Sequence, residues 1–259
     1  MTTYETLSSQ KKTAVNLLTS WYSKARPNQL VVDDSKYNIY LFLAGRGWGK
    51  TLTGAYDLTQ YCLTNPNSIC GVVAPTYGDL KRVCFGGESG LINIVDKDLL
   101  DSTGYNKSSN EIHFFNGSKI IGIPAESYDR LRGVQFHRAW LDELCSYRYP
   151  EAFDNLMMAL RLGKEPKCII TTTPRPTKLL KDLVKRDDVR LIKGSTFDNV
   201  ENLPVSTIRM LRERYEGTTI GKQELYAEII DMNENALFKH NNIHDNRVKK
   251  APQLTKIVV

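Results

Sequence analysis

The stretch AGRGWGKT, residues 44–51, decides the fold prediction for this sequence. It matches the phosphate-binding pattern G-x-x-x-x-G-K-[ST] at every fixed position except the first, where Ala44 stands in place of glycine. A buried-strand pattern at 37–43 precedes it, and a helix-prone segment follows from residue 51. A strand, a glycine loop and a helix in this order are the context in which such a loop holds phosphate. The sequence therefore predicts a phosphate-binding loop.

The fixed residues of this loop have physical roles that fit phosphate binding. Glycine permits left-handed backbone angles and a close approach of backbone N–H groups to the phosphates, and the loop has Gly45, Gly47 and Gly49. Lys50 would reach the β- and γ-phosphates as a point charge. Thr51 would place its hydroxyl on Mg²⁺, and the helix that follows would direct its positive end at the anion.

Two variable positions of the loop, Arg46 and Trp48, are further candidates for contact with the nucleotide. Arg46 either contacts phosphate or is solvated, and Trp48 either lies at the nucleotide or packs in the interior. For the loop as a whole, the alternative is a glycine-rich turn with an incidental Lys-Thr pair. The flanking strand and helix favour phosphate binding.

Two adjacent acids, Asp142 and Glu143, end a weaker strand pattern at 136–141 that His137 and Arg138 interrupt. A phosphate-binding loop needs a carboxylate at the end of a neighbouring strand for Mg²⁺, and often a second acid to orient water. Adjacent residues at a strand end point in different directions, so one acid can face the metal and the other the γ-phosphate. The chain between the loop and this pair is long enough for an extra strand. The alternative is an ordinary acidic loop.

The rest of the chain alternates strand and helix patterns, which predicts an α/β fold with a mostly parallel central sheet and helices on both faces. The predicted elements are a helix at 9–24, strands at 69–74 and 167–173, a hairpin at 110–124 around Asn116-Gly117, and helices at 178–186 and within 206–230. We expect four parts: a helical amino-terminal appendage with an adenine-side segment (1–36), a core (37–177), a small helical lid (178–238) and a linker (239–259).

Composition and charge exclude several classes of protein. The 259 residues are 41% hydrophobic and 25% charged, which is typical of a globular protein with a real core. Neither a membrane-spanning run nor a signal-peptide core is evident. Five cysteines in no metal-like spacing are expected to be buried and free. The net charge of +6 permits a polyanionic partner without requiring one.

Six segments, in order along the chain, resemble the ATPase half of the large terminase subunit of tailed bacteriophages. They are ARPNQ (25–29), GRGWGKT (45–51), VVAPTYGDLKRV (72–83), RLRGVQFHRAWLDEL (130–144), TTTP (171–174), and a closing set made of FDNVENLP (197–204), GKQELYAEI (221–229) and NALF (235–238). The resemblance implies a P-loop NTPase fold of the type called ASCE, in which an extra strand separates the two nucleotide-binding strands.

The resemblance also assigns roles to residues. It implies that Gln29 contacts adenine, that Asp142 holds Mg²⁺ and that Glu143 activates water. Gln29 could instead cap a turn. The resemblance further implies that Thr171, Thr172 and Thr173 sense the γ-phosphate and relay hydrolysis to a DNA-gripping surface. Their alternative is a β-rich strand end.

An arginine that reaches into the neighbouring subunit's site is also implied by the resemblance. Arg130 and Arg132 fall in the right region, and the glycine after Arg132 favours that residue. The alternative is a surface arginine or an ion pair.

The function that the resemblance implies is Mg²⁺-dependent ATP hydrolysis that drives double-stranded DNA into a procapsid. The implied partners are DNA, a portal protein, a small terminase subunit and other copies in a pentameric ring, in the cytoplasm of an infected bacterium and with no membrane. Family members carry a nuclease domain, and KIVV (256–259) stands where its first strand would begin. We therefore expect this chain to be part of a longer protein and to lack nuclease activity.

Two alternative functions remain open from the sequence. One is a helicase-like DNA-dependent ATPase of another superfamily, which the lack of further helicase motifs after TTTP disfavours. The other is a nucleotide-gated DNA-binding or assembly module with little turnover.

Overall fold

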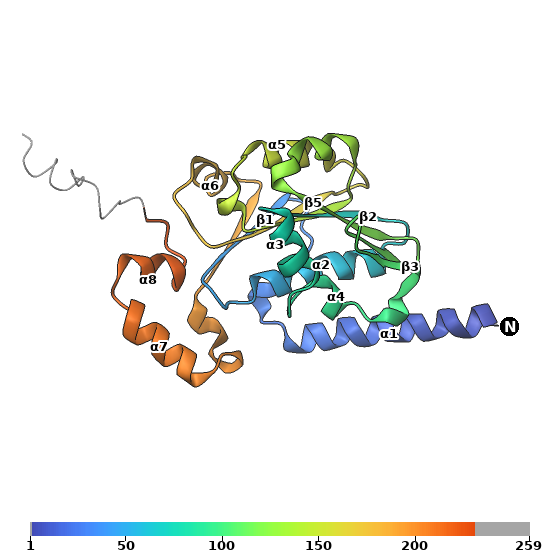
Figure 1. The fold of residues 1–259 in the computed structure, drawn as a ribbon, viewed down its shortest axis with the longest axis horizontal. Coiled ribbons are helices and arrows are strands. Elements are labelled where there is room, and N and C mark those ends of the chain that lie inside the picture. Colours follow the sequence, from blue (N-terminus) through green and yellow to red (C-terminus); the bar gives the residue numbers. More distant parts are fainter. Residues whose placement is uncertain (1, 231–259) are drawn as a thin grey trace, which may run out of the picture. The chain divides into compact units, whose positions relative to one another are not determined.

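A sheet of eight strands, in the order β3-β4-β5-β2-β6-β7-β1-β8, lies at the centre of the computed structural model, which describes residues 2–230 (Figure 1). Neighbouring strands from β5 to β8 pair in parallel, whereas β3 and β4 pair antiparallel. The strands are β1 (Ile39–Ala44), β2 (Ile69–Ala74), β3 (Leu100–Asn106), β4 (Glu111–Phe114), β5 (Lys119–Pro124), β6 (Arg138–Asp142), β7 (Lys167–Thr172) and β8 (Val189–Gly194). The predicted α/β fold is confirmed. The predicted linker at 239–259 lies outside the described residues.

Strand β7 lies between β1, which leads into the glycine loop, and β6, which ends at the paired acids. The extra strand expected between the two motifs is therefore present. Residue pairs Leu43↔Thr172 and Asp142↔Thr171 show that the three strands end level with one another. This register brings the glycine loop, the paired acids and the TTTP segment to the carboxyl edge of the sheet.

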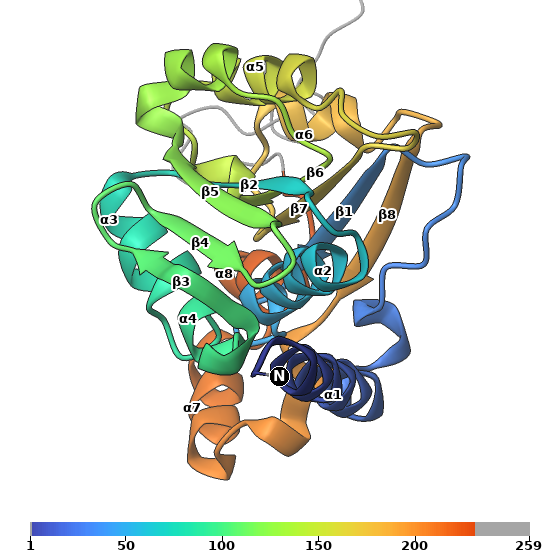
Figure 2. The ribbon, with the colours of Figure 1, turned by 90° about the vertical axis from the view of Figure 1, so that its right-hand side faces the viewer.

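Helices cover both faces of the sheet (Figure 2). One face carries α5 (Glu151–Ala159), α6 (Lys178–Leu183) and the 3₁₀ segment η4 (Ala125–Gly133), and the other carries α2 (Lys50–Thr64), η2 (Leu80–Phe85) and α4 (Leu91–Ile94). The remaining elements are α1 (Thr2–Lys24), η1 (Pro27–Gln29), α3 (Tyr77–Asp79), η3 (Lys97–Leu99), η5 (Leu144–Ser146), η6 (Thr196–Asn202), α7 (Val205–Tyr215) and α8 (Thr219–Glu224).

Strand β1 contributes to two hydrophobic cores because its side chains alternate between the faces. Leu41 and Leu43 lie in the core under α5 and α6, whereas Tyr40 and Phe42 lie in the core under α2. A strand buried on both faces has no polar side, which explains the continuous apolar run before the glycine loop. The five cysteines are buried and free, as expected.

The hairpin at Asn116-Gly117 is confirmed. Gly117 has a φ of 81°, which suits glycine in a tight turn, and β4 and β5 pair with Glu111 opposite Ile121. Within the described residues, no helix combines the length and the apolar composition needed to cross a bilayer.

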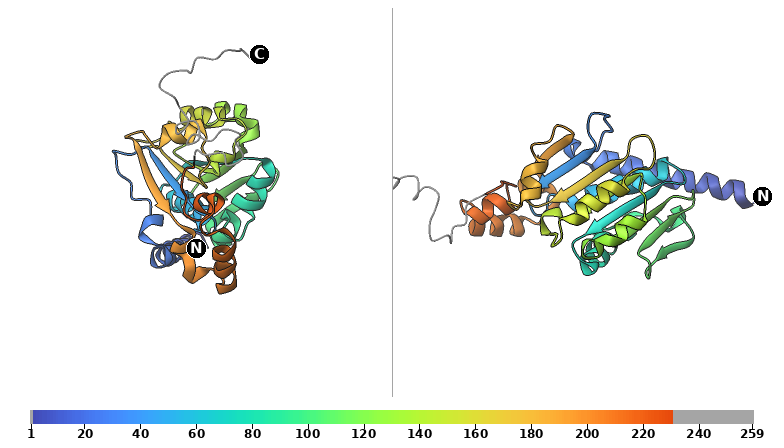
Figure 3. Two further views of the ribbon diagram at one scale, coloured as in Figure 1. Left: turned by 90° about the vertical axis from the view of Figure 1, so that its left-hand side faces the viewer. Right: turned by 90° about the horizontal axis from the view of Figure 1, so that it is seen from above.

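Strand β8 was not predicted, because the sequence from residue 178 was interpreted as helical. It pairs with β1 along its full length, so the sheet extends past the expected core boundary at 177. Its outer edge carries exposed Arg190 and Lys193, which interrupt the apolar pattern typical of a buried strand. Helices α7 and α8 follow it beyond the carboxyl edge of the sheet (Figure 3).

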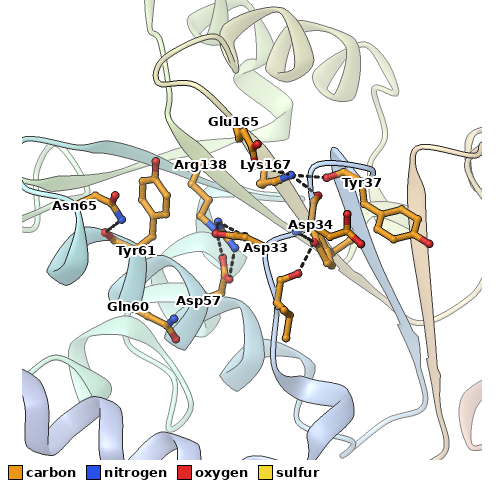
Figure 4. A network of polar contacts seen from close by, with 12 residues as sticks. Asp33, Asp34, Tyr37, Asp57, Gln60, Tyr61, Asn65, Arg138, Glu165 and Lys167 are labelled. Atoms are coloured by element: carbon orange, nitrogen blue, oxygen red, sulfur yellow. Dashed lines mark hydrogen bonds and ion pairs between the residues drawn. The ribbon is translucent and has the colours of Figure 1, made fainter.

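Arg138 does not interrupt β6, contrary to the sequence interpretation. Its side chain is 4% exposed and donates two hydrogen bonds to Asp57 of α2, at 2.7 and 2.8 Å, and one to Asp33 at 3.0 Å (Figure 4). Lys167 is buried beside this cluster and donates to the carbonyl oxygens of Asp34 and Tyr37. The charge at the start of β6 therefore joins the strand to α2 and to the segment before β1.

Replacing Arg138 by glutamine is expected to lower the free energy of unfolding by about 3 kcal/mol, because it leaves the Asp57 carboxylate buried without its partner. The matched control is Arg186→Gln, which breaks the more exposed pair with Asp188 and is expected to cost less than about 1 kcal/mol. Urea unfolding measures both. Equal losses for the two variants would contradict this account of β6.

Candidate functional site

The glycine loop connects the carboxyl end of β1 to the amino terminus of α2. Gly49 is the residue before the helix, with a φ of 98°, and Gly47 has a φ of 75°. Both angles are in the left-handed region that glycine adopts without strain. The first N–H groups of α2 have no acceptor within the helix, so this end of the helix can bind an anion.

Residues from both ends of the described chain hold the carbonyl oxygens of the loop. Thr196 Oγ1 donates to Arg46 O at 2.7 Å, and Asn199 Nδ2 donates to Gly47 O at 2.8 Å. Arg26 donates to Trp48 O and to Asn199 Oδ1, and its guanidinium lies 4.9 Å from the centre of the Trp48 ring. These bonds fix three consecutive carbonyl groups of the loop.

Lys50 is buried at the base of the loop, and its ammonium group uses all three protons. It donates to Ala44 O at 3.0 Å, to Gly45 O at 3.2 Å and to Thr173 Oγ1 at 2.9 Å. Its Nζ atom also lies 3.6 Å from Glu143 Oε1. The structure thus brings the lysine of the loop, one of the paired acids and the last threonine of TTTP together.

Glu143 has left-handed backbone angles, with φ and ψ both 49°. A non-glycine residue in this region is strained by about 1 kcal/mol or more, and such strain is common at functional sites. The turn directs the Glu143 carboxylate towards Lys50, where it accepts the Thr173 N–H at 3.1 Å. The Glu143 side chain is 35% exposed, so water can reach it.

Asp142 points the other way, into the sheet. Its Oδ1 accepts the Thr171 hydroxyl at 2.8 Å, and its Oδ2 lies 3.7 Å from Cys84 Sγ. Burial and the neighbouring Glu143 raise the pKa of Asp142 to about 7, against the opposing effects of the Thr171 hydrogen bond and Lys50. The two adjacent acids therefore occupy different environments, as the sequence predicted.

The Trp48 side chain packs in the interior, which was the alternative to a side-chain contact with the nucleotide. It is fully buried beside Phe42, and its indole N–H donates to Asp198 Oδ2 at 3.2 Å. Gly194 makes the space for it, since a Cβ there would lie 2.0 Å from the indole nitrogen.

Gln29 is buried and has partners for both ends of its amide. Its Oε1 accepts the Arg26 N–H at 3.1 Å, and its Nε2 donates to Thr53 Oγ1 at 3.2 Å. It caps the turn that precedes the core, which was the alternative to adenine contact. It also lies against the loop, since a Cβ on Gly49 would be 2.9 Å from its Nε2.

The three threonines of TTTP do not share one environment. Thr171 is buried beside Asp142, and Thr173 lies between Lys50 and Glu143. The Thr172 hydroxyl accepts the Cys145 N–H at 3.1 Å instead, because alternate residues of a strand face opposite sides of a sheet. A γ-phosphate contact by the Thr171 or Thr172 hydroxyl does not fit this placement.

Arg46 and Arg132 both lie outside this cluster. The Arg46 side chain is 80% exposed and lies 3.8 Å from Glu224, while its backbone N–H donates to Glu224 O. Arg132 is exposed in η4, where it pairs with Asp129 at 3.7 Å. Since η4 follows β5, which three strands separate from β1, Arg132 is not brought to the glycine loop of its own chain.

The donor set at this edge fits Mg²⁺. Asp142 offers a carboxylate, and Thr51, in the first turn of α2, has a hydroxyl with no hydrogen-bond partner among residues 2–230. Within that same range no group of three or more metal-ligating side chains occurs. Mg²⁺ typically takes one or two protein oxygens and completes its shell with water and substrate phosphates.

A family model described as "Terminase large subunit, T4likevirus-type, N-terminal" matches residues 41–245. The chain belongs to this family. The match contains most of β1, the glycine loop, both acids and the TTTP segment, and so confirms the resemblance. Among curated proteins, no sequence matches the chain.

Solved terminase structures share the fold. The ATPase domain of the large terminase of Thermus phage P74-26 superposes with a TM-score of 0.62 at 16% identity, covering 80% of this chain and 94% of that one. The large terminase of another thermophilic bacteriophage has a TM-score of 0.59 at 17% identity, covering 84% of this chain and 53% of that one. The present chain thus corresponds to about half of that second protein.

No sequence motif of this terminase chain indicates the residues outside the loop that hold its carbonyl groups. Arg26 and Asn199 bond each other across 173 positions, and Thr196 bonds the loop across 150. The segments ARPNQ and FDNV contain two of these residues, Arg26 and Asn199, but nothing in the local sequence indicates that the two segments meet. Contacts between such distant parts of a chain have no periodic signal.

Gly45→Ala is expected to lower the free energy of unfolding by about 1 to 3 kcal/mol, because its Cβ would lie 2.5 Å from Leu225 O and 2.9 Å from Glu224 O. Thermal denaturation with and without ATP measures the effect, and ATP should protect this variant less than the parent. Gly133→Ala is the control, since a Cβ there meets nothing within 4 Å. If the two variants lose equal stability, the loop is not held against residues 224–225.

Proposed function

We propose that this chain is the ATPase motor domain of a terminase large subunit, which hydrolyses ATP to move double-stranded DNA into a procapsid. The observation that carries the proposal is the convergence of Lys50, Glu143 and Thr173, with Asp142 beside them, at the amino terminus of α2. Family membership supports the same assignment. The large terminase of the second thermophilic bacteriophage has been solved with ATP-gamma-S and with ADP, which supports a nucleotide as the ligand.

The residues at this edge can each perform one part of ATP hydrolysis. The N–H groups of the loop and of the first turn of α2 would bind phosphate oxygens, and Lys50 would exchange its carbonyl partners for the β- and γ-phosphates. Glu143 would orient the attacking water and accept its proton. Asp142 and Thr51 would hold Mg²⁺, which neutralises the charge that develops on the phosphates.

The bond from Lys50 to Thr173 supports a link between nucleotide binding and the TTTP segment. Lys50 donates to the Thr173 hydroxyl, which lies 3.4 Å from Glu143 Oε1. If Lys50 moves to the phosphates, the Thr173 hydroxyl loses a donor and becomes free to contact the γ-phosphate. Thr173 is therefore the threonine that we propose as the sensor.

The partners of this domain follow from the proposed function. We propose double-stranded DNA, a portal protein, a small terminase subunit and neighbouring copies in a pentameric ring, in the cytoplasm of an infected bacterium. DNA contact would be directed at phosphates and therefore sensitive to salt. We propose no nuclease activity for this chain.

Glu143→Gln is expected to keep ATP binding within about twofold and to lower kcat by about a thousandfold or more, because glutamine keeps the size of the side chain but cannot accept the proton. Steady-state hydrolysis and nucleotide titration measure the two effects. Glu151→Gln, an exposed glutamate of α5, is the control and should behave as the parent does. Hydrolysis by Glu143→Gln near the parent's rate would exclude this base, and the module with little turnover would predict two indistinguishable proteins.

Exposed Arg132 is proposed to act in the site of a neighbouring subunit. Arg132→Ala should abolish ATP hydrolysis in the assembled ring, because an arginine that stabilises the transferring phosphoryl group contributes about a thousandfold or more. Mixing it with Lys50→Ala subunits should restore part of the activity, since mixed interfaces then contain one intact site. Arg130→Ala tested in the same way decides between the two arginines. No recovery in a sample shown to be assembled would contradict the proposal.

A further inference from the structure

The hydroxyl of Thr171 lies between an indole and the acid assigned to Mg²⁺. Thr171 is fully buried in β7, and its neighbour in the register is Asp142 of β6. Trp140 Nε1 lies 2.6 Å from Thr171 Oγ1, which lies 2.8 Å from Asp142 Oδ1. Three side chains from two adjacent strands thus form a short hydrogen-bonded chain that ends at the carboxylate.

The donor and acceptor of each of these hydrogen bonds follow from the number of protons that each side chain carries. An indole N–H can only donate, so the Thr171 oxygen is the acceptor of the bond from Trp140. The hydroxyl has one proton, and its two acceptors are Asp142 Oδ1 at 2.8 Å and Leu141 O at 3.3 Å. The shorter bond favours Asp142. The hydroxyl therefore donates to the carboxylate.

Helix α2 fixes the position of the indole. Trp140 is fully buried, and Gly54 of α2 lies directly against it. A Cβ at Gly54 would be 2.2 Å from Trp140 Cε2 and 2.3 Å from Nε1. The absence of a side chain at this position lets the indole nitrogen reach Thr171. The same helix begins at Lys50 and Thr51, so one element positions both the phosphate-binding groups and the indole.

We propose that Thr171 and Trp140 are positioning residues that hold the Asp142 carboxylate in one orientation for Mg²⁺. This inference rests on the function proposed above and replaces the γ-phosphate contact expected of Thr171. Mg²⁺ requires nearly ideal octahedral geometry, so a carboxylate free to rotate binds it less well than a fixed one. Hydrogen bonds to a ligating side chain commonly contribute about tenfold to a hundredfold in metal affinity.

The test is the Mg²⁺ dependence of nucleotide binding, measured with a fluorescent non-hydrolysable ATP analogue in EDTA and at increasing Mg²⁺. Thr171→Val keeps the shape and removes the hydroxyl, so the Mg²⁺ concentration for half-maximal tightening should rise by about tenfold or more. Binding in EDTA should stay within about twofold of the parent, because Asp142 contributes only through the metal. Thr171→Ser should restore the midpoint of the parent.

Two further variants separate positioning from a general loss of stability. Thr59→Val removes another fully buried threonine hydroxyl, which donates to Ala55 O at 2.8 Å, and should leave the Mg²⁺ midpoint unchanged. Trp140→Phe keeps a buried ring without the N–H, and its midpoint should rise less than that of Thr171→Val. It also carries the test by itself if Thr171→Val does not fold.

A parental Mg²⁺ midpoint in folded Thr171→Val, or in Trp140→Phe, would overturn the proposal, as would Thr171→Ser that behaves like Thr171→Val. These outcomes differ from a failure of the proposed function. In that case the parent protein itself would show neither Mg²⁺-dependent tightening nor ATP hydrolysis.

Discussion

The contact between helix α2 and strand β6 is the constraint on which the rest of the site depends. The two elements touch at three positions along their length. Asp57 bonds Arg138 at the start of the strand, Gly54 lies against Trp140 in its middle, and Lys50 lies 3.6 Å from Glu143 at its carboxyl end. Residues 50, 54 and 57 lie on one face of a helix. A shift by one residue in either element would break all three contacts. The ion pair between Arg138 and Asp57 therefore also sets the position of Lys50 relative to Glu143.

The threonines at the end of β7 give Asp142 and Glu143 different environments. The Thr171 hydroxyl accepts a hydrogen bond from the Trp140 indole N–H and donates one to Asp142. The Thr173 hydroxyl accepts a hydrogen bond from Lys50 and lies beside Glu143. Because side chains alternate along this segment, Thr171 and Thr173 face one side of the sheet and Thr172 faces the other. Asp142 is thereby buried and held by the Thr171 hydroxyl. Glu143 is partly exposed to water and lies 3.6 Å from the Lys50 ammonium group.

The fold and the centre of the site could be predicted because local patterns encode them. The glycine loop, the apolar run of β1, the Asn116-Gly117 turn and the paired acids each have a signal within a few residues. Strand β8 could not be predicted because exposed Arg190 and Lys193 interrupt its apolar pattern. The role of Arg138 could not be predicted because its partners lie 81 and 105 positions away along the chain.

The resemblance treated the three threonines alike, and the variable loop position of Trp48 made its side chain a candidate for contact with the nucleotide. The environment of each threonine depends on strand register, and that of Trp48 depends on packing against η6. Neither can be obtained from sequence spacing, because register and packing arise only when distant segments meet. Arg26, which bonds the loop and Asn199 together, was missed for the same reason.

We propose that these contacts build a site that hydrolyses ATP in a DNA motor. The most direct test is the rate of ATP hydrolysis at a series of protein concentrations, with and without double-stranded DNA. Our account predicts Mg²⁺-dependent turnover that rises more steeply than in proportion to protein concentration, because exposed Arg132 completes the site of a neighbour. Tight ATP binding without turnover at any concentration would contradict the claim.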